Sequence, residues 1–386
     1  MRKSSLLTLM HPAILILVTS MQACAQPGAS STTKRIHFTE KKIASEAYES
    51  AGIMDVNNDG VPDIVSGSFW YVGPEFRDRY FIKDQPRFGE YYDDFSTISI
   101  DVNGDGRLDV ITGGWFGKNL RWRENPGNNG QWTEHIFAQT GNVECTITAD
   151  INKDGFPDIV PNTPGAPLDV FMLNRDNTGK GLGSFSSIRI AQKQGHGIGC
   201  GDVNGDGFVD IVLNNGWLES PKTFNTVDWK LHSAFDLGDA SVPVIVADVN
   251  KDGLNDIIAG KGHDFGLSWY EQAKKGNNWI KHEIDQKHSQ FHVLAYDDID
   301  GDGTMELITG KRFRAHDSHD PGSYDDYGIY MYRWNGKSFD KETITFGPFG
   351  KGKGTGLSIS ISDINGDGKK DIVVPGKDGL SVFVQD

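Results

Sequence analysis

Seven copies of a nine-residue acidic motif hold the residues best suited to bind a metal ion. The clearest copy runs from Asp202 to Asp210 and reads Asp-x-Asn-x-Asp-Gly-x-x-Asp. Side-chain oxygens at positions 1, 3, 5 and 9 and a backbone carbonyl at position 7 can surround one hard cation, and the glycine at position 6 tolerates positive φ. Calcium prefers such oxygen ligands, so we expect up to seven structural Ca²⁺ ions.

The predicted calcium ligands are the side chains at these four positions of each motif. They are Asp55, Asn57, Asp59, Asp63; Asp101, Asn103, Asp105, Asp109; Asp150, Asn152, Asp154, Asp158; Asp202, Asn204, Asp206, Asp210; Asp248, Asn250, Asp252, Asp256; Asp298, Asp300, Asp302, Glu306; and Asp363, Asn365, Asp367, Asp371. The sixth motif is atypical because Glu306 replaces the last Asp. An EF-hand loop would continue into a helix, whereas an apolar run such as 256–260 follows position 9 here. Those runs are predicted strands.

Five histidines outside the motifs form a second set of candidate functional residues. They are His196, His263, His292, His316 and His319. Neutral imidazole is a preferred ligand of Zn²⁺ and similar metals. We expect His196, His263 and His292 to hold Zn²⁺ or another divalent metal, and His316 to act as the acid or base beside it.

A polar insertion at 311–326 occupies the widest spacing between motifs. A loop of this length on a compact scaffold usually covers or forms a site, although a solvated loop is the alternative. We expect its residues Lys311, Arg312, His316, His319 and Tyr324 to form the catalytic group, with Lys311 or Arg312 holding the substrate.

Aromatic residues that follow the apolar runs are candidate sugar ligands, because flat rings beside polar groups suit sugar rings. The predicted substrate-binding residues are Trp70, Trp115, Trp217, Lys118 and Asp264. Asp93, Asp94 and Glu144 add negative charge to the same region. Such mixed charge suits proton transfer better than anion capture.

The spacing of the motifs predicts the elements that bring these residues together. Successive motifs start 46 to 65 residues apart, a period typical of propeller blades. Each unit has four predicted strands with the motif between the first and second, so we expect an all-β, seven-bladed β-propeller with calcium-binding loops. Residues 35–43 resemble the missing fourth strand of the last unit, which would close the ring.

On the face opposite the motifs, the starts of first strands should meet the loops that follow second strands. The five candidate histidines fall at these positions. By contrast, His135, His232 and His282 each follow a Trp by three residues in predicted fourth strands. We expect these three to be structural residues of the outer rim.

The N-terminal segment predicts export. Arg2 and Lys3 precede an apolar run at 6–18 that is short for a membrane span but fits a signal peptide. We assign 1–23 to a signal peptide, 24–33 to a polar tether and 34–386 to the propeller. Residues 21–24 resemble a lipoprotein signal with Cys24 as the lipidated residue, and ordinary cleavage nearby is the alternative. The protein is then periplasmic, an outer-membrane lipoprotein or extracellular.

Charge and cysteine content exclude two classes of protein. The formal net charge is −15, and 22 of the 53 acidic residues are motif ligands. Nucleic-acid binding has no electrostatic support, because no basic stretch is present to follow phosphates. Cys145 and Cys200 are the only cysteines besides Cys24, too few for a disulfide framework.

The repeated acidic units resemble FG-GAP or VCBS repeats, found in integrin-type and many secreted bacterial β-propellers. A narrower resemblance, to the propeller domain of aldos-2-ulose dehydratase, rests on 195–199, 263–267, 289–292 and 310–316. It implies elimination of water from keto-sugars. The cupin-type domains of the fungal enzyme are absent here, so any activity that resides in them does not carry over.

These observations predict a carbohydrate-active lyase or dehydratase that performs metal-assisted β-elimination on a keto-sugar or related saccharide. A non-catalytic glycan-binding or adhesive propeller is the alternative, because fold does not decide function. A polysaccharide lyase on uronic-acid glycans is a further alternative and would need cations that neutralise carboxylates. Carbohydrate is the expected partner in each case.

Overall fold

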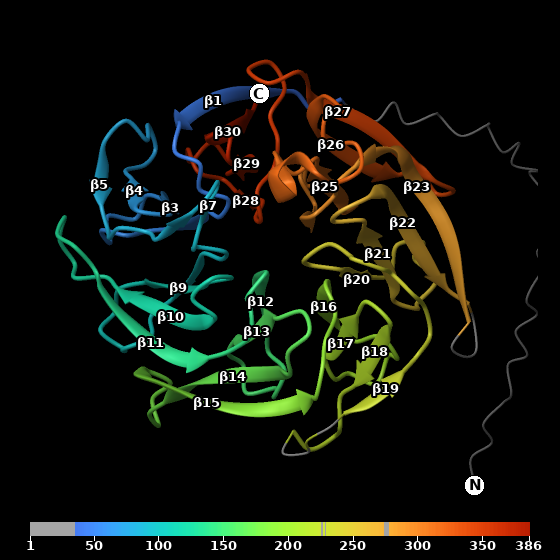
Figure 1. Ribbon diagram of the computed structural model, residues 1–386, viewed down its shortest axis with the longest axis horizontal. Coiled ribbons are helices and arrows are strands. Elements are labelled where there is room, and N and C mark those ends of the chain that lie inside the picture. The colour runs from blue at the N-terminus through green and yellow to red at the C-terminus, as the bar shows by residue number, and fades with distance from the viewer. Residues whose placement is uncertain (1–34, 225–226, 228, 274–277) are drawn as a thin grey trace, which may run out of the picture. The chain divides into compact units, whose positions relative to one another are not determined.

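Seven four-stranded antiparallel sheets lie around a common centre as the blades of a propeller (Figure 1). They belong to the unit 36–386 of the computed structural model, which describes residues 35–224, 227, 229–273 and 278–386. The predicted seven-bladed, all-β fold is therefore confirmed. The predicted signal peptide, Cys24 and the tether lie outside the described residues.

The first four blades follow one another along the chain. Blade one contains β2 (Gly52–Met54), β3 (Asp63–Ser66), β4 (Phe69–Tyr71) and β5 (Arg79–Phe81); blade two β8 (Ile98–Ile100), β9 (Asp109–Gly113), β10 (Asn119–Glu124) and β11 (Thr133–Gln139); blade three β12 (Cys145–Ala149), β13 (Asp158–Asn162), β14 (Leu168–Arg175) and β15 (Gly181–Ala191); and blade four β16 (Ile198–Gly201), β17 (Asp210–Leu213), β18 (Gly216–Glu219) and β19 (Lys230–His232).

The remaining blades complete the ring. Blade five contains β20 (Ile245–Ala247), β21 (Asp256–Gly260), β22 (Phe265–Gln272) and β23 (Trp279–Ser289); blade six β24 (Leu294–Asp297), β25 (Glu306–Gly310), β26 (Tyr327–Trp334) and β27 (Phe339–Gly347); and blade seven β28 (Ser360–Ser362), β29 (Asp371–Val374), β30 (Leu380–Gln385) and β1 (Phe38–Ala44). A hairpin of β6 (Arg87–Phe88) and β7 (Tyr91–Tyr92) separates blades one and two in the sequence, and the 3-10 helix η1 (Ala315–Ser318) lies in the insertion of blade six.

The two ends of the unit close the ring by sharing blade seven. Strand β1 pairs antiparallel with β30, with Phe38 opposite Gln385 and Ala44 opposite Leu380. The predicted closure by an N-terminal strand is confirmed, and the strand spans 38–44 rather than 35–43. Closure matters because it packs blade seven against blade one, so that no blade at the end of the row exposes an apolar face.

Each acidic motif forms the hairpin between the first and second strands of a blade. In blade four, Gly207 has a φ of 85° and donates its N–H to Oδ2 of Asp202 at 2.8 Å. The last motif residue, Asp210, is fully buried and accepts hydrogen bonds from the N–H groups of Val203 and Ser220 at 2.9 and 2.8 Å. The motif therefore also ties its hairpin to the third strand.

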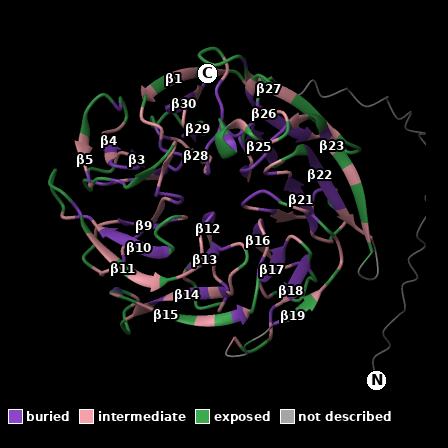
Figure 2. Cartoon of the chain, viewed as in Figure 1, coloured by how far each residue is buried: buried purple, intermediate pink, exposed green. Residues whose placement is uncertain are grey.

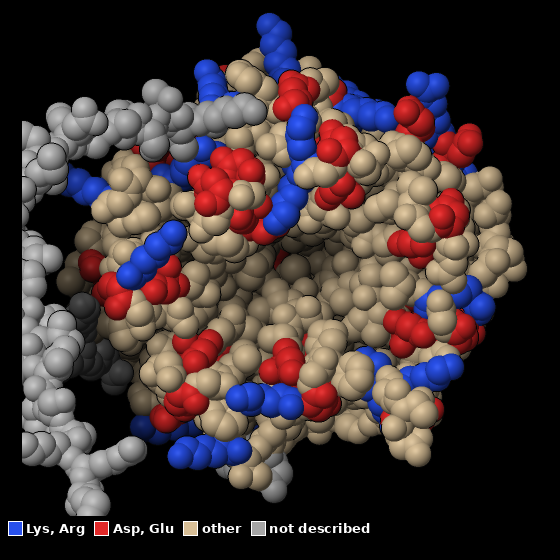
Figure 3. All heavy atoms as spheres, turned by 180° about the vertical axis from the view of Figure 1, so that it is seen from behind, with Lys and Arg blue, Asp and Glu red and all other residues tan. Residues whose placement is uncertain are grey.

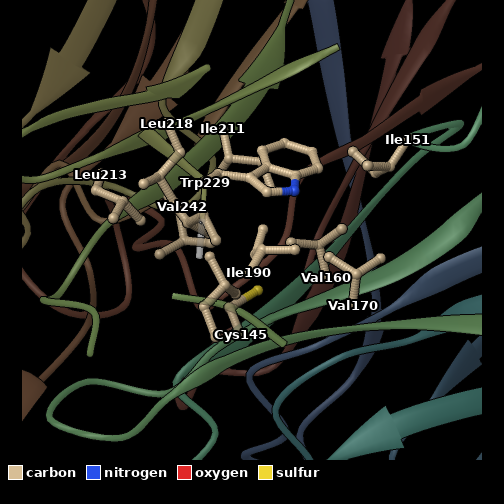
Figure 4. Close-up of a cluster of buried hydrophobic side chains, with 12 residues drawn as sticks. Cys145, Ile151, Val160, Val170, Ile190, Ile211, Leu213, Leu218, Trp229 and Val242 are labelled. Atoms are coloured by element: carbon tan, nitrogen blue, oxygen red, sulfur yellow. The ribbon is translucent and has the colours of Figure 1, made fainter. Parts of the chain in front are cut away.

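Seven clusters of buried apolar side chains hold the ring together, one at each junction between neighbouring blades. Figure 4 shows the junction of blades three and four, where Val160 and Ile190 share one cluster with Trp229. The outer strands carry many of the exposed residues (Figure 2). Burial of apolar surface at every junction is the main force that keeps the blades together.

Neither a disulfide nor a membrane-spanning helix is found in the described residues. Cys145 and Cys200 are both free, and burial raises the pKa of the Cys145 thiol to about 12. No helix in that part of the chain is long and apolar enough to cross a bilayer.

Candidate metal centre in the central funnel

Four ligand-type side chains from blades three to six meet near the centre of the ring. Glu144 directly precedes β12, and His196 and His292 lie two residues before β16 and β24. His263 follows β21. One ligand atom of each residue lies within 4.8 Å of those of the other three. We call Glu144, His196, His263 and His292 the central cluster.

Short polar contacts connect the central cluster. Nε2 of His292 lies 2.8 Å from Oε1 of Glu144, and Nε2 of His196 lies 3.6 Å from the same oxygen. The Nε2 atoms of His196 and His263 lie 3.1 Å apart. No side chain of the cluster is more than 12% exposed, so solvent screens these contacts only weakly.

Hydrogen bonds on the far side of two imidazoles decide which nitrogens face the cluster. Nδ1–H of His196 donates to the carbonyl oxygen of Ala240 at 2.8 Å, and Nδ1–H of His263 donates to Oδ2 of Asp320 at 3.1 Å. In the neutral rings, both Nε2 atoms therefore carry lone pairs, and these face each other across 3.1 Å. Two facing lone pairs repel unless a proton or a cation lies between them.

The surroundings alter the pKa of each cluster member. Burial alone would raise the pKa of Glu144, but the hydrogen bond from His292 and the nearby ring of His196 hold that pKa well below its usual range. Burial lowers the pKa of His292 strongly and that of His263 to about 4. Burial opposes the charged form of His196 too and is the largest single effect, yet Glu144, the carbonyl of Ala240 and Asp239 together outweigh it and raise the pKa of His196. Glu144 is thus ionised, while His263 and His292 are neutral and able to bind a metal.

The central cluster fits a transition metal. Three imidazoles and a carboxylate are a typical donor set for Zn²⁺. In a tetrahedral zinc site with Zn–N bonds of about 2.0–2.1 Å, two ligand nitrogens lie about 3.3 Å apart. The two Nε2 atoms here lie 3.1 Å apart, close to that distance. A carbonyl and a carboxylate behind His196 and His263 are the usual partners of metal-bound imidazoles. His292 differs from these two, because its Nε2 lies 2.8 Å from Glu144 and its Nδ1 has no hydrogen-bond partner among the described residues.

The blade-six loop, residues 311–326, places a further histidine beside the central cluster. Nδ1–H of His316 donates to Oδ1 of Asp320 at 3.0 Å, which leaves Nε2 as the basic nitrogen. The rings of His316 and His263 stack with centroids 4.3 Å apart. The backbone N–H of His316 donates to the hydroxyl of Tyr91 at 2.7 Å. His316 is therefore held next to the cluster at two points.

A cavity of about 320 Å³ opens beside the central cluster. Its lining combines an aromatic wall with polar groups: Tyr91, Phe95, Trp115, Phe116, Glu144, Arg312, His316 and Asp317. Phe116 is 37% exposed and is backed by Phe88, which stacks on it at 4.4 Å. The cavity is near the lower end of the ~300–1,000 Å³ range of small-molecule sites.

The two cations expected to hold substrate are engaged by the protein instead. Arg312 is 2% exposed and lies 3.0 Å from Glu49 and 3.2 Å from Glu144. Nζ of Lys311 donates to the carbonyl oxygens of Gly322 and Asp325, the latter at 2.6 Å. Lys311 thus anchors the blade-six loop, and Arg312 joins two glutamates.

Other predicted site residues are distributed differently from the expectation. Trp115 lines the cavity, whereas Trp70 and Trp217 are buried between neighbouring blades at 2% and 4% exposure. Lys118 and Asp264 are exposed and lie in turns outside the cavity lining. His319 and Tyr324 are also exposed, and Tyr324 at 92% projects into solvent.

Two residues of the site escaped prediction from the sequence. Glu144 was recognised only as a negative charge, yet it precedes a first strand just as His196 and His292 do, and comparing the repeats position by position would have identified it. Asp320 lies in an insertion that other blades lack, so its position in the repeat carries no signal.

Among the acidic motifs, the sixth brings three carboxylates close together. Acidic side chains gather at several places around a central hollow in Figure 3. In the sixth motif, Asp298, Asp300 and Asp302 offer oxygens within 4.8 Å of one another. Arg333 of β26 lies 3.2 Å from both Asp300 and Glu306, so this motif already contains a positive charge.

Three outer histidines pair with neighbouring side chains in one recurring arrangement. His232 stacks on Trp217 at 4.2 Å, and its Nε2 lies 2.7 Å from Glu219. His135 and His282 repeat this arrangement with Trp122 and Glu124, and with Trp269 and Glu271. These contacts support the structural role expected of the three residues.

Comparison with known proteins identifies the repeat. Residues 101–160 and 248–309 match the family model described as FG-GAP-like repeat. The chain carries FG-GAP-like repeats. Both matched segments contain acidic motifs of the kind described above, so the acidic motif and the family signature coincide.

Two solved structures resemble the FG-GAP-like propeller. A structure of BBS1N in complex with ARL6DN is 10% identical, with a TM-score of 0.52 and coverage of 91% of this chain and 97% of that chain. An Agrocybe aegerita lectin that recognises non-reducing terminal N-acetylglucosamine is 14% identical, with a TM-score of 0.49 and coverage of 88% and 85%. At these identities the likeness concerns the fold alone. Curated protein sequences give no significant match.

Proposed function

We propose that this FG-GAP-like propeller is a metal-dependent carbon–oxygen lyase that eliminates water or an alcohol from a keto-sugar or related saccharide. The observation that carries the proposal is the pair of Nε2 atoms of His196 and His263, which face each other at 3.1 Å in a cluster whose carboxylate, Glu144, lines an aromatic-walled cavity. A purely structural core has little reason to gather three buried imidazoles around a carboxylate that lines a cavity.

Glu144, His196, His263 and His292 would hold the metal, with Zn²⁺ as the expected ion. A divalent cation bound there would act as a Lewis acid toward a substrate carbonyl oxygen. Ala240 and Asp320 keep the Nδ1 protons of His196 and His263 on the far side of each ring.

His316 is the candidate general base. Its Nε2 takes the proton from the carbon next to the carbonyl, and the C–H electron pair forms the new double bond. The C–O bond at the neighbouring carbon breaks, and the departing oxygen takes a proton to leave as water or an alcohol. Asp320 stabilises the resulting imidazolium by accepting its Nδ1–H at 3.0 Å.

The cavity lining supports a sugar substrate. Trp115 and Phe116 supply flat apolar faces, and Glu144 and His316 supply polar groups in the same cavity. Arg312 is already paired with Glu49 and Glu144, so it offers little unpaired positive charge to a uronate carboxylate. This favours a keto-sugar over the uronic-acid glycans of the further alternative.

We also propose structural calcium in the acidic motifs and export of the protein. The calcium proposal is supported by the oxygen donor sets of the motifs. The export proposal, with Cys24 as a candidate lipid anchor, is supported by the N-terminal sequence.

The proposal is tested by incubating the zinc-loaded protein with keto-sugars and with uronic-acid glycans. We expect keto-sugars to give an ultraviolet-absorbing product, because elimination conjugates a double bond with the carbonyl. His316→Gln should slow product formation by about 10²- to 10⁴-fold and keep the bound zinc. His319→Gln is the matched control in the same loop, since His319 is exposed and outside the cavity lining.

One result would favour the non-catalytic alternative. In that result, none of the tested substrates would yield product, but glycans would still bind. A triple variant with His196, His263 and His292 replaced by Ala would also bind glycans as well as the unmodified protein does.

A further inference from the structure

The carboxylate of Asp320 connects the blade-six loop to the central cluster. Its side chain is 10% exposed, with Oδ2 3.1 Å from Nδ1 of His263 and Oδ1 3.0 Å from Nδ1 of His316. His263 belongs to the central cluster, and His316 lines the cavity. One carboxylate therefore contacts both the imidazole expected to hold the metal and the imidazole expected to move the proton.

We propose that Asp320 is a positioning residue that couples metal binding in the central cluster to closure of the blade-six loop. This inference rests on the proposed function, because it requires a metal at the central cluster. Nothing in the repeat pattern assigns this role, since Asp320 lies in the insertion particular to blade six.

The coupling follows from the tautomer of His263. With Asp320 in place, Nδ1 carries the proton and Nε2 offers a lone pair to the cluster. When the loop moves away, Nδ1 loses this acceptor, and the tautomer with the proton on Nε2 is no longer disfavoured. That tautomer cannot bind a metal through Nε2, so an open loop weakens metal binding.

The loop is built so that Asp320 arrives at a defined position. Lys311 binds the carbonyl oxygens of Gly322 and Asp325, which lie on the C-terminal side of Asp320. Tyr91 accepts the N–H of His316 on its N-terminal side at 2.7 Å. Coupling free energies are reciprocal. If the closed loop raises the affinity of the central cluster for a metal, the bound metal must therefore stabilise the closed loop by the same free energy.

A second metal site at the same residues is the competing explanation. His263, His316 and Asp320 do offer ligand atoms within 4.8 Å of one another. However, both Nδ1 atoms lie within hydrogen-bond distance of the carboxylate, and the two rings stack at only 16° from parallel. Hydrogen bonding alone accounts for this group.

The experiment compares zinc affinity and loop exchange in the unmodified protein, Asp320→Asn and Asp325→Asn. Both variants exchange a carboxylate for an isosteric amide in the same loop, and the side chain of Asp325 is exposed. We expect Asp320→Asn to weaken zinc binding by about 10- to 100-fold, the usual effect of losing an outer partner of a metal-bound histidine. We expect Asp325→Asn to leave zinc affinity unchanged.

Hydrogen exchange of 311–326 supplies the second measurement. Zinc should slow amide exchange of this segment in the unmodified protein and in Asp325→Asn, and have little effect in Asp320→Asn. Unchanged exchange in the blades shows that Asp320→Asn is folded.

Each negative outcome has a distinct meaning. If Asp320→Asn binds zinc within about twofold of the unmodified protein, or if zinc leaves exchange of the loop unchanged in the unmodified protein, the coupling is refuted while the proposed function stands. If the unmodified protein binds no zinc, both proposals fail.

Discussion

The Nε2 atoms of His196 and His263 lie 3.1 Å apart, although 67 positions separate the two residues in the sequence. Each ring is held from behind, one by the carbonyl of Ala240 and the other by Asp320. Such an arrangement of buried lone pairs costs free energy unless a proton or a metal cation occupies the space between them. This contact shows that the packing of two adjacent blades determines the geometry of the central cluster.

Removal of a single cluster ligand should abolish tight zinc binding. We expect His196→Ala, His263→Ala, His292→Ala or Glu144→Gln to weaken zinc binding by at least ~100-fold, beyond the usual effect of losing an outer partner. Zinc content after dialysis against a zinc buffer measures this, with His319→Ala as the exposed control. Equal zinc content in His263→Ala and the unmodified protein would exclude the central cluster as the metal site.

Two tryptophans that follow second strands should behave in opposite ways. Trp115→Ala should weaken saccharide binding and leave stability nearly unchanged, because Trp115 lines the cavity. Trp217→Ala should lower the free energy of unfolding by about 3–5 kcal/mol, because Trp217 is 4% exposed and packs in the core between blades four and five. Urea unfolding and calorimetric titration with a binding sugar measure the two effects. If Trp217→Ala is fully folded but binds the sugar more weakly, while Trp115→Ala binds it normally, the sugar does not bind in the cavity beside Trp115.

Lys311 should make stability increase with pH. Burial lowers its pKa to about 8 in the folded protein, below the value of roughly 10.4 in an unfolded chain. From about pH 8 to pH 10 the unfolded chain therefore binds more protons at this residue, and the free energy of unfolding rises with pH. Urea unfolding at pH 7.5 and 9.5 should show a smaller rise in Lys311→Met than in the exposed control Lys337→Met. Identical rises in the two variants would contradict the burial argument.

Calcium removal should destabilise the propeller. Each loop saturated at 100 times its Kd would contribute about 2.7 kcal/mol, so EGTA should lower Tm substantially. We expect the sixth motif to bind calcium most weakly, because Arg333 lies 3.2 Å from Asp300 and Glu306. Calcium titration should therefore resolve one weak site, which Arg333→Gln strengthens. A melting curve that EGTA leaves unchanged would argue against structural calcium.

The blades and their order were predictable from local sequence alone. A motif that recurs at a nearly constant period, each time followed by an apolar strand, determines a closed array, because every blade must bury its faces against two neighbours. The same periodicity identified His196, His263 and His292 as residues outside the repeat. It also predicted the closure of blade seven by an N-terminal strand, since the last unit lacked one.

Tertiary structure alone decided which side chains lie together in the central cluster and the adjoining cavity. Trp70, Trp115 and Trp217 occupy similar positions in the sequence, yet Trp70 and Trp217 belong to third strands after tight turns, whereas Trp115 lies in a longer turn before β10. Strand pairing directed the side chains of the first two into the cores between neighbouring blades and left Trp115 at the cavity. Lys311 and Asp320 show the same limit, because their partners depend on how one insertion folds back on itself. Contacts between residues far apart in the chain follow from the packing of whole blades, which no local spacing encodes.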